Sequence, residues 1–322
     1  MRIRLLLSLF VLFFSSTPHA VEKLIQTSSQ EEIPVTVFNV DYKADKNTPV
    51  LLWLPTEYGI HGREAATAEA LAQKGIEVWI ADLHSAFFLP FGRSSYNNIQ
   101  DNDIVELIKT ASNNEQREVI LFATGRAAPI ALRAVRELQA HQSTKNIVKS
   151  AILFHPNFYM NTVNVGDDIN YQPITYATNL ALYIVQPSLS GKSYQLKTLT
   201  RHLQKGGSDV MSQILSGVGD GFNIRKPDNE IEKQAYLKTS SIIFKATQLL
   251  KHFKKKDMQR NSQKQQQTNH QASLMPACKH TREQLKSFTW TSMTERISTI
   301  HYQLIKEKYY CLISGQAGAH LA

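Results

Sequence analysis

The sequence is poor in cysteine, and its two cysteines, Cys278 and Cys311, both lie close to the C-terminus. The preceding residues therefore hold neither a disulfide framework nor a cysteine-rich metal site. In an oxidising compartment the two cysteines are able to form a disulfide that closes the end of the chain. A redox-active or metal-binding pair is the alternative, which the absence of a C-x-x-C spacing disfavours.

The chain also lacks a hydrophobic run long enough to cross a bilayer, which takes about 20 apolar residues. The apolar stretch at residues 5–14 is interrupted only by Ser8, with Arg2 and Arg4 before it and small residues up to Ala20 after it. This layout is typical of a secretory signal that is cleaved after Ala20. An uncleaved membrane anchor is the alternative. We therefore expect a periplasmic or secreted protein without a stable membrane span once the signal is removed.

The central part of the chain lacks an excess of either charge. The net charge is +9, but Arg2, Arg4 and the lysine- and arginine-rich residues 251–322 account for all of it. Residues 21–250 are therefore close to neutral. A nucleic-acid-binding domain needs a basic face on its folded surface, so we predict no nucleic-acid partner.

Short apolar runs alternate with amphipathic stretches between residues 33 and 253, which predicts an α/β fold with a doubly wound, mostly parallel sheet. Runs that are apolar throughout are typical of strands buried on both faces. The predicted strands are 33–40, 49–54, 76–81, 119–122, 150–154, 180–185 and 210–216, and one long helix is predicted at 229–253. Pro34 favours an antiparallel edge position for the strand 33–40.

Composition divides the chain into four parts: a signal peptide (1–20), the α/β domain (21–253), a low-complexity basic and glutamine-rich linker (254–273) and a short tail with the two cysteines (274–322). The linker is too polar to offset the entropy of ordering it, so we expect it to be disordered. The tail has one amphipathic helical pattern, at 281–309. A vestige of a truncated or altered second domain is an alternative interpretation of the tail.

The most informative local pattern is a strand, a sharp turn and a helix within residues 118–130. Residues 119–122 are apolar, 123–127 (here called the elbow) read Ala-Thr-Gly-Arg-Ala, and an apolar helical pattern begins near Pro129. Over about residues 22–253 the chain resembles the α/β-hydrolase fold superfamily, in which this unit carries the motif G-x-S-x-G and its serine attacks the substrate. In that alignment Gly125 takes the serine position.

The same resemblance places the other two members of the catalytic triad. The acid normally follows the strand matched by 180–185, where this chain has Ser190 near the expected position. The histidine normally lies in a motif similar to G-x-x-H-G-F, and residues 217–222 match that frame with Asp220 in its place. The resemblance therefore implies a hydrolase scaffold with a degenerate triad at Gly125, Ser190 and Asp220.

A rearranged active site is the alternative. Nucleophile and base must lie within hydrogen-bond reach of each other, and no spacing in the sequence predicts such a pair. The available hydroxyls and histidines are Thr124, Ser94, Ser95, Ser190, His84 and His155. His155 follows a predicted strand, where open α/β sheets hold ligands, although a histidine that stabilises a loop is the more ordinary interpretation.

The elbow also has the features of an anion site, because N–H groups at a helix N-terminus favour anions. The guanidinium of Arg126 either adds to that site or pairs with a neighbouring acid. Glu57, Asp82 and Asp220 each follow a predicted strand, but no ligand spacing indicates a metal. The candidate ligand-binding residues are Glu57, Tyr58, Asp82, Thr124, Gly125, Arg126, His155 and Asp220, and Phe87, Phe88 and Phe91 are candidates for either a pocket wall or ordinary packing.

From these patterns we expect an exported, α/β-hydrolase-like protein that is non-catalytic and binds a small ligand or a protein partner above the elbow, without a cofactor or metal. An atypical serine or threonine hydrolase of ester or acyl bonds, working through a rearranged site, is the alternative. A redox role of Cys278 and Cys311 is a third hypothesis.

Overall fold

The computed structural model describes residues 20–39, 48–113, 116–140, 147–161 and 169–253. These residues belong to one compact unit, Met1–Leu274. The predicted signal peptide, linker, tail helix and Cys278–Cys311 disulfide lie outside the described residues. Among the helices that are described, none is both long and apolar enough to cross a membrane.

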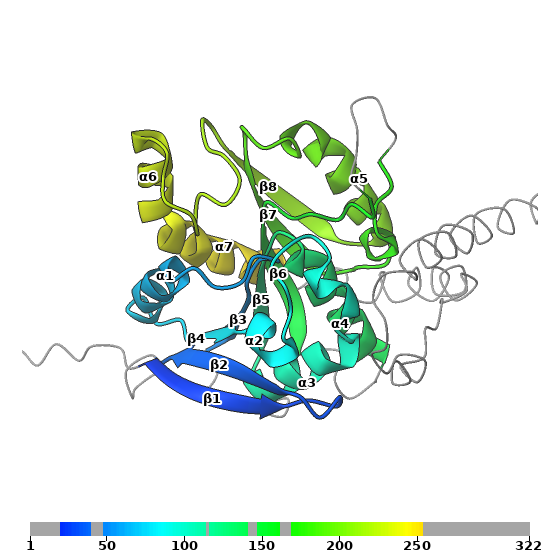
Figure 1. The fold of residues 1–322 in the computed structure, drawn as a ribbon. Helices are drawn as coiled ribbons and strands as arrows, with labels where there is room; N and C mark the ends of the chain where they lie inside the picture. The colour runs from blue at the N-terminus through cyan, green and yellow to red at the C-terminus, as the bar shows by residue number, and fades with distance from the viewer. Residues whose placement is uncertain (1–19, 40–47, 114–115, 141–146, 162–168, 254–322) are drawn as a thin grey trace, which may run out of the picture. The chain divides into compact units, whose positions relative to one another are not determined.

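The centre of the molecule is an eight-stranded, mostly parallel sheet (Figure 1). Its order is β1-β2-β4-β3-β5-β6-β7-β8, in which β1 with β2 and β2 with β4 are antiparallel and all other pairs are parallel. The strands are β1 (Ala20–Gln26), β2 (Glu32–Phe38), β3 (Val50–Leu54), β4 (Val78–Ala81), β5 (Val119–Thr124), β6 (Val148–Phe154), β7 (Ala181–Pro187) and β8 (Asp209–Leu215). The predicted α/β class is confirmed.

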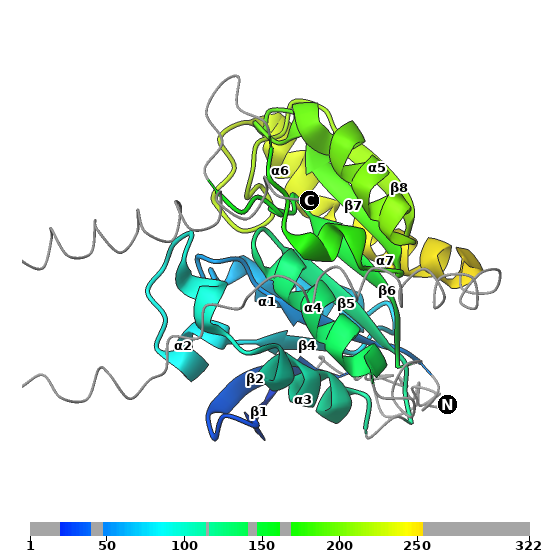
Figure 2. The same cartoon turned by 90° about the vertical axis from the view of Figure 1, so that its right-hand side faces the viewer.

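Helices cover both faces of this sheet, as Figures 1 and 2 show. One core cluster packs α2, α3, α4 and α5 on one face, and a second packs α1 and α7 on the other. The helices are α1 (Arg63–Ala72), α2 (Leu83–Phe87), α3 (Asp101–Ala111), α4 (Ala127–Ala140), α5 (Leu196–Gly206), α6 (Glu230–Leu237) and α7 (Thr239–Phe253), with 3-10 turns η1 (Ser95–Asn98), η2 (Pro173–Tyr176) and η3 (Ser193–Gln195).

The central strands are predominantly apolar because they are covered on both faces. All residues of β3 and β5 are buried. Successive side chains point to opposite faces, so Leu52 belongs to the cluster under α3 and α4 whereas Trp53 belongs to the cluster under α1 and α7. This double burial leaves the loops at the strand ends as the places where polar groups gather.

Two predicted elements differ from the structure. The strand predicted at 33–40 is not the edge strand, because β1 pairs along its outer side. The side chains of β1 are mostly exposed, so it has no hydrophobic period from which to predict it. The helix predicted at 229–253 is two helices. Thr239 is buried and its hydroxyl donates to the Ala235 carbonyl at 3.3 Å, a type of bond that bends helices.

Candidate functional site

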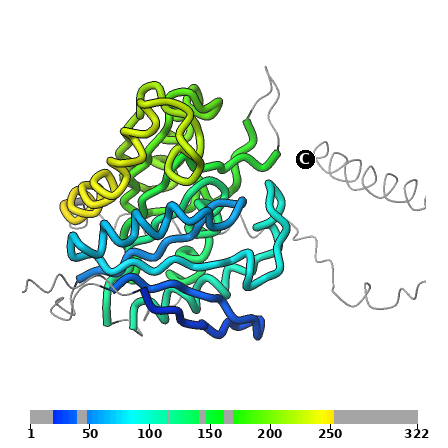
Figure 3. The backbone as a smooth tube through the Cα atoms, turned by 60° about the vertical axis from the view of Figure 1, so that its left-hand side comes forward, coloured from blue at the N-terminus to red at the C-terminus, as the bar shows by residue number. Residues whose placement is uncertain are grey.

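The loops at the carboxyl ends of the parallel strands enclose a cavity of about 450 Å³. The tube view in Figure 3 shows how these connections gather at one edge of the sheet. The cavity is lined by Thr56, Glu57, Tyr58, His61, Arg93, Gly125, His155, Asn157, Lys192, Asp220, Gly221, Ile224 and Arg225. Crevices at this edge are where open α/β sheets bind their ligands, and the volume suits a small molecule.

At the elbow, the chain turns from β5 into α4 through Gly125, whose φ of +58° lies in the left-handed region. The carboxylate of Glu57, from the loop after β3, accepts a hydrogen bond from the Arg126 backbone N–H at 2.9 Å. A Cβ atom on Gly125 would overlap Oε2 of Glu57. The carboxylate of Glu57 therefore fills the space of a side chain at position 125 and occupies the N-terminus of α4.

The backbone of Glu57 is held in place by three donors. Its carbonyl oxygen accepts hydrogen bonds from the Gly92 N–H at 2.9 Å, from Ser95 Oγ at 3.1 Å and from His84 Nε2 at 3.1 Å. Glu57 is only 7% exposed. The position of its carboxylate on the elbow is thus set by a buried network.

His155 is the cavity residue with the most unusual environment. It follows β6 with a φ of +37°, which is uncommon for a residue other than glycine. Its Nε2 donates to Oδ1 of Asn223 at 3.3 Å, which leaves Nδ1 as an acceptor. Burial lowers the pKa of His155 below its ordinary value of 6.5, with smaller opposing effects of Asp220 and Glu57. The imidazole is therefore neutral at pH 7.

The loops after β7 and β8 are joined by an ion pair between Lys192 and Asp220. Ser190 is buried, and its hydroxyl accepts the Lys192 backbone N–H at 3.1 Å. On the other side of Asp220, its backbone carbonyl accepts a bond from the Arg225 guanidinium at 2.9 Å. These contacts connect the two loops and leave the Lys192–Asp220 pair in the cavity wall.

The order of the strands and the left-handed turn at Gly125 together identify the fold. The protein has the α/β-hydrolase fold. It is similar to the esterase Est22 (TM-score 0.57, 10% identity, 74% of this chain and 83% of that chain). It is also similar to a hyperthermophilic esterase from the archaeon Pyrobaculum calidifontis (TM-score 0.55, 12% identity, 71% of this chain and 84% of that chain). A third similar structure is a putative dienelactone hydrolase from Klebsiella pneumoniae (TM-score 0.51, 12% identity, 69% of this chain and 97% of that chain). No protein-family model and no curated protein matches the sequence.

In the α/β-hydrolase fold, the triad follows the order nucleophile, acid, histidine, and the N–H of the residue after the nucleophile belongs to the oxyanion hole. Here Gly125 follows β5, Ser190 follows β7 and Asp220 follows β8. The N–H at the position of that donor is the N–H of Arg126, and it is bonded to Glu57. A carboxylate therefore stands where the fold otherwise stabilises a developing negative charge.

Of the candidate ligand-binding residues, Glu57, Tyr58, Gly125, His155 and Asp220 line the cavity. The remaining three do not line it. Asp82 accepts from the N–H and hydroxyl of Ser85 at the start of α2, Arg126 Nη1 donates to the Tyr159 carbonyl at 3.5 Å, and Thr124 is fully buried. Phe88 and Phe91 are 89% and 71% exposed and do not line the cavity.

The hydroxyls and histidines of the rearranged alternative do not form a nucleophile–base pair among the described residues. Ser95 Oγ and His84 Nε2 both bind the Glu57 carbonyl, and burial lowers the pKa of His84. Within the part of the chain that the structure describes, Thr124 Oγ1 has no hydrogen-bond partner.

Sequence reasoning missed several cavity residues, chiefly Lys192, Asn157, Arg93 and Arg225. Lys192 directly follows Ser190-Gly191 after β7, so its place in the loop was a usable signal. The described residues contain no group of three or more His, Cys, Asp or Glu side chains arranged to hold a metal ion.

Proposed function

We propose that this protein uses the α/β-hydrolase fold to bind a small polar ligand in the cavity above the elbow, without hydrolysing it. The observation that carries the proposal is the bond from the Arg126 N–H to the Glu57 carboxylate, which fills the space beside Gly125. Hydrolysis by this fold needs a nucleophile at that turn and a free donor for the oxyanion. Glu57 supplies a negative charge at the place where both would act.

The cavity wall supports a polar ligand. The Lys192–Asp220 pair presents both charges, Asn157 offers an amide, and neutral His155 offers Nδ1 as an acceptor. Groups of this kind fix the orientation of a small molecule through a few convergent hydrogen bonds.

Absence of hydrolysis is tested with purified protein, short-chain chromogenic esters and a serine-reactive fluorophosphonate probe. We expect no turnover above the buffer rate and no labelling. Turnover that disappears in Ser94→Ala, Ser95→Ala, Thr124→Ala or Ser190→Ala would support the atypical hydrolase instead. Turnover that disappears in Glu57→Gln would overturn the proposal as well, because the carboxylate itself would then be acting on the substrate.

Binding is tested by a thermal-shift screen of amino acids, small carboxylic acids, sugars and nucleosides, followed by calorimetry of compounds that raise the melting temperature. For a compound held in the cavity, Asn157→Leu and His155→Phe should each weaken binding about tenfold, the effect of one lost hydrogen bond of about 1.4 kcal/mol. Tyr183→Phe, which alters a distant groove, is the matched control. Equal binding by all variants would place the ligand elsewhere.

We also propose that the protein is exported, on the strength of Arg2, Arg4, the apolar residues 5–14 and the small residues before Ala20. The test is expression of the full chain in a Gram-negative bacterium, followed by fractionation and N-terminal sequencing. A periplasmic product that starts at Val21 is expected. A membrane-bound product that keeps Met1 would establish the uncleaved anchor.

A further inference from the structure

The part of the cavity next to the elbow (here called the floor) carries two acceptor atoms that the protein leaves unused. Oε2 of Glu57 accepts the Arg126 N–H, whereas Oε1 has no hydrogen-bond partner among the described residues. His155 donates through Nε2 to Asn223, and its Nδ1 likewise has no partner among these residues. Neither of the two atoms is fully buried, although Glu57 and His155 are only 7% and 5% exposed. Both atoms therefore open into the cavity that the two residues line.

The elbow turn holds these two side chains in the same region of the cavity. The carboxylate of Glu57 fills the space beside Gly125. On the other strand, the Gly125 N–H donates to the Phe154 carbonyl at 3.1 Å, and the Gly125 carbonyl accepts the Asn157 N–H at 2.9 Å. These two bonds enclose His155 in the sequence and hold its backbone next to the turn. The two free acceptors therefore belong to one floor rather than to separate walls.

The carboxylate of Glu57 forms no ion pair with a basic side chain among the described residues. Two basic residues of the cavity wall are paired with other acids, since Lys192 binds Asp220 and Arg225 binds two carboxylates of its own loop and helix. Arg93, also in the wall, is exposed to solvent. A carboxylate that is largely removed from water is stabilised by a cationic partner. A ligand that brings a positive charge to Oε1 supplies that partner.

The same floor disfavours an anionic ligand. The N-terminus of α4 is the kind of place where an anion binds, but the carboxylate of Glu57 already accepts the Arg126 N–H there. A carboxylate or phosphate of a ligand would lie beside that carboxylate and be repelled by it. The free nitrogen of neutral His155 is an acceptor and offers no proton to an anion.

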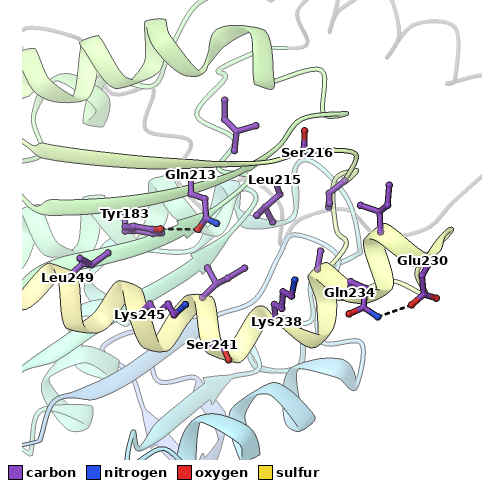
Figure 4. Close-up of a pocket in the computed structure, with 15 residues that line it drawn as sticks. Tyr183, Gln213, Leu215, Ser216, Glu230, Gln234, Lys238, Ser241, Lys245 and Leu249 are labelled. Atoms are coloured by element: carbon purple, nitrogen blue, oxygen red, sulfur yellow. Dashed lines mark hydrogen bonds between the residues drawn. The ribbon is translucent and has the colours of Figure 1, made fainter.

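A groove of about 710 Å³ between β8 and the helices α6 and α7 provides a contrast (Figure 4). Its carboxylate, Glu230, accepts hydrogen bonds from Gln234 Nε2 at 2.8 Å and from Lys233 Nζ at 3.2 Å. The amide oxygen of Gln213 accepts the Tyr183 hydroxyl at 2.9 Å. These acceptors of the groove are bound within the protein, whereas those of the floor are left for a ligand.

We propose that the cavity binds a small protonated amine, whose ammonium group donates to Oε1 of Glu57 while Nδ1 of His155 accepts a further hydrogen of the ligand. This inference rests on the proposed binding function and narrows its ligand to one chemical class. An ammonium group has three donors and no acceptor, which suits two free acceptors. Because charge-assisted hydrogen bonds are roughly twice as strong as neutral ones, an amine is favoured over an alcohol of the same shape.

The first test is calorimetry of the wild-type full chain with matched probes. The probes are the amine, the alcohol and the carboxylate built on each of three carbon groups, n-propyl, cyclohexylmethyl and 2-phenylethyl. On at least one group the amine should bind about tenfold or more tightly than the alcohol, and the carboxylate should not bind. The trimethylammonium analogue of that amine keeps the charge but has no N–H, and it should also bind about tenfold or more weakly. An alcohol, carboxylate or trimethylammonium probe that binds as tightly as the amine, or no binding by any amine, would overturn the inference.

The second test uses a matched pair of substitutions that each remove one carboxylate charge. Glu57→Gln keeps an oxygen acceptor for the Arg126 N–H and should weaken the tightest amine about tenfold or more, with the affinity for the alcohol unchanged. Glu230→Gln makes the same change in the groove and should alter neither affinity. Unchanged amine binding in Glu57→Gln, or an equal loss in Glu230→Gln, would place the amine elsewhere and overturn the inference.

Failure of this inference and failure of the proposed function give different results. A sugar, alcohol or carboxylate that binds in the cavity when no amine does would show that the ligand class is wrong, while the binding function stands. Ester turnover that disappears in Glu57→Gln would show that the binding function itself is wrong. Thermal unfolding of each variant shows whether it is folded, and the comparison of probes on the wild type needs no variant.

Discussion

At the scale of single residues, the decisive contact is between Glu57 and the elbow. The two partners of the hydrogen bond, Glu57 and Arg126, are 69 positions apart. The glycine at position 125, where the α/β-hydrolase motif has its serine, can be identified from the sequence alone. The presence of a carboxylate in its place depends on a loop conformation that is set by Gly92, Ser95 and His84.

Gly125→Ser should destabilise the protein rather than create a hydrolase. The new side chain would overlap Glu57 and adopt a left-handed conformation that is unfavourable for serine, at a combined cost of about 2–4 kcal/mol. Chemical denaturation of the single variants and the double variant measures this cost. In a Glu57→Gly background the same substitution should cost clearly less. Equal costs in both backgrounds would show that the carboxylate does not occupy this space.

The buried His155 should make stability depend on pH. In the folded state, burial lowers the pKa of His155 below its ordinary value of 6.5. As the pH falls, the imidazole is therefore protonated in the unfolded chain before it is protonated in the folded chain. The contribution to stability is full above about pH 6.5 and is lost as the pH falls from there toward the folded pKa. We expect His155→Gln to lose less unfolding free energy than the wild type between pH 7.5 and 5.5. An identical loss would exclude His155 as the cause.

At the scale of elements, burial explains which strands were predictable. The predominantly apolar strands β3, β5 and β7 are covered on both faces, and their apolar runs can be recognised in the sequence without tertiary information. Strand β1 is held mainly by its backbone hydrogen bonds to β2. Backbone pairing does not require a particular pattern of side chains, so the sequence does not predict this strand. The division of 229–253 into α6 and α7 likewise depends on the burial of Thr239.

A matched pair of leucines tests this difference between strands. Leu52 in β3 is fully buried, whereas Leu24 in β1 is 64% exposed. Leu52→Ala should lower the free energy of unfolding by about 2–5 kcal/mol through lost burial and a cavity. Leu24→Ala should change it by about 0.5 kcal/mol or less. Urea titrations of both variants give the comparison, and equal effects would contradict the core assigned to β3.

At the scale of the whole molecule, the proposed export bears on Cys278 and Cys311. In an oxidising compartment we predict that they form a disulfide, which contributes about 3–4 kcal/mol by restricting the unfolded tail. A thiol titration of the periplasmic protein under denaturing conditions should find no free thiols. Two free thiols would exclude the bridge, and a high-molecular-mass band that disappears on reduction would show pairing between chains.

The sequence by itself determined the alternation of strands and helices and the loss of a side chain at Gly125, because both are recorded in local patterns of apolar and small residues. It also placed Ser190 and Asp220 after the strands that carry the acid and the histidine of the α/β-hydrolase fold. Only the tertiary structure decided that Glu57 fills the elbow, that Lys192 pairs with Asp220, and that β8 is the last strand of the sheet among the described residues. These features depend on which loops and strands meet in space, and neighbours that are distant in the sequence leave no local pattern.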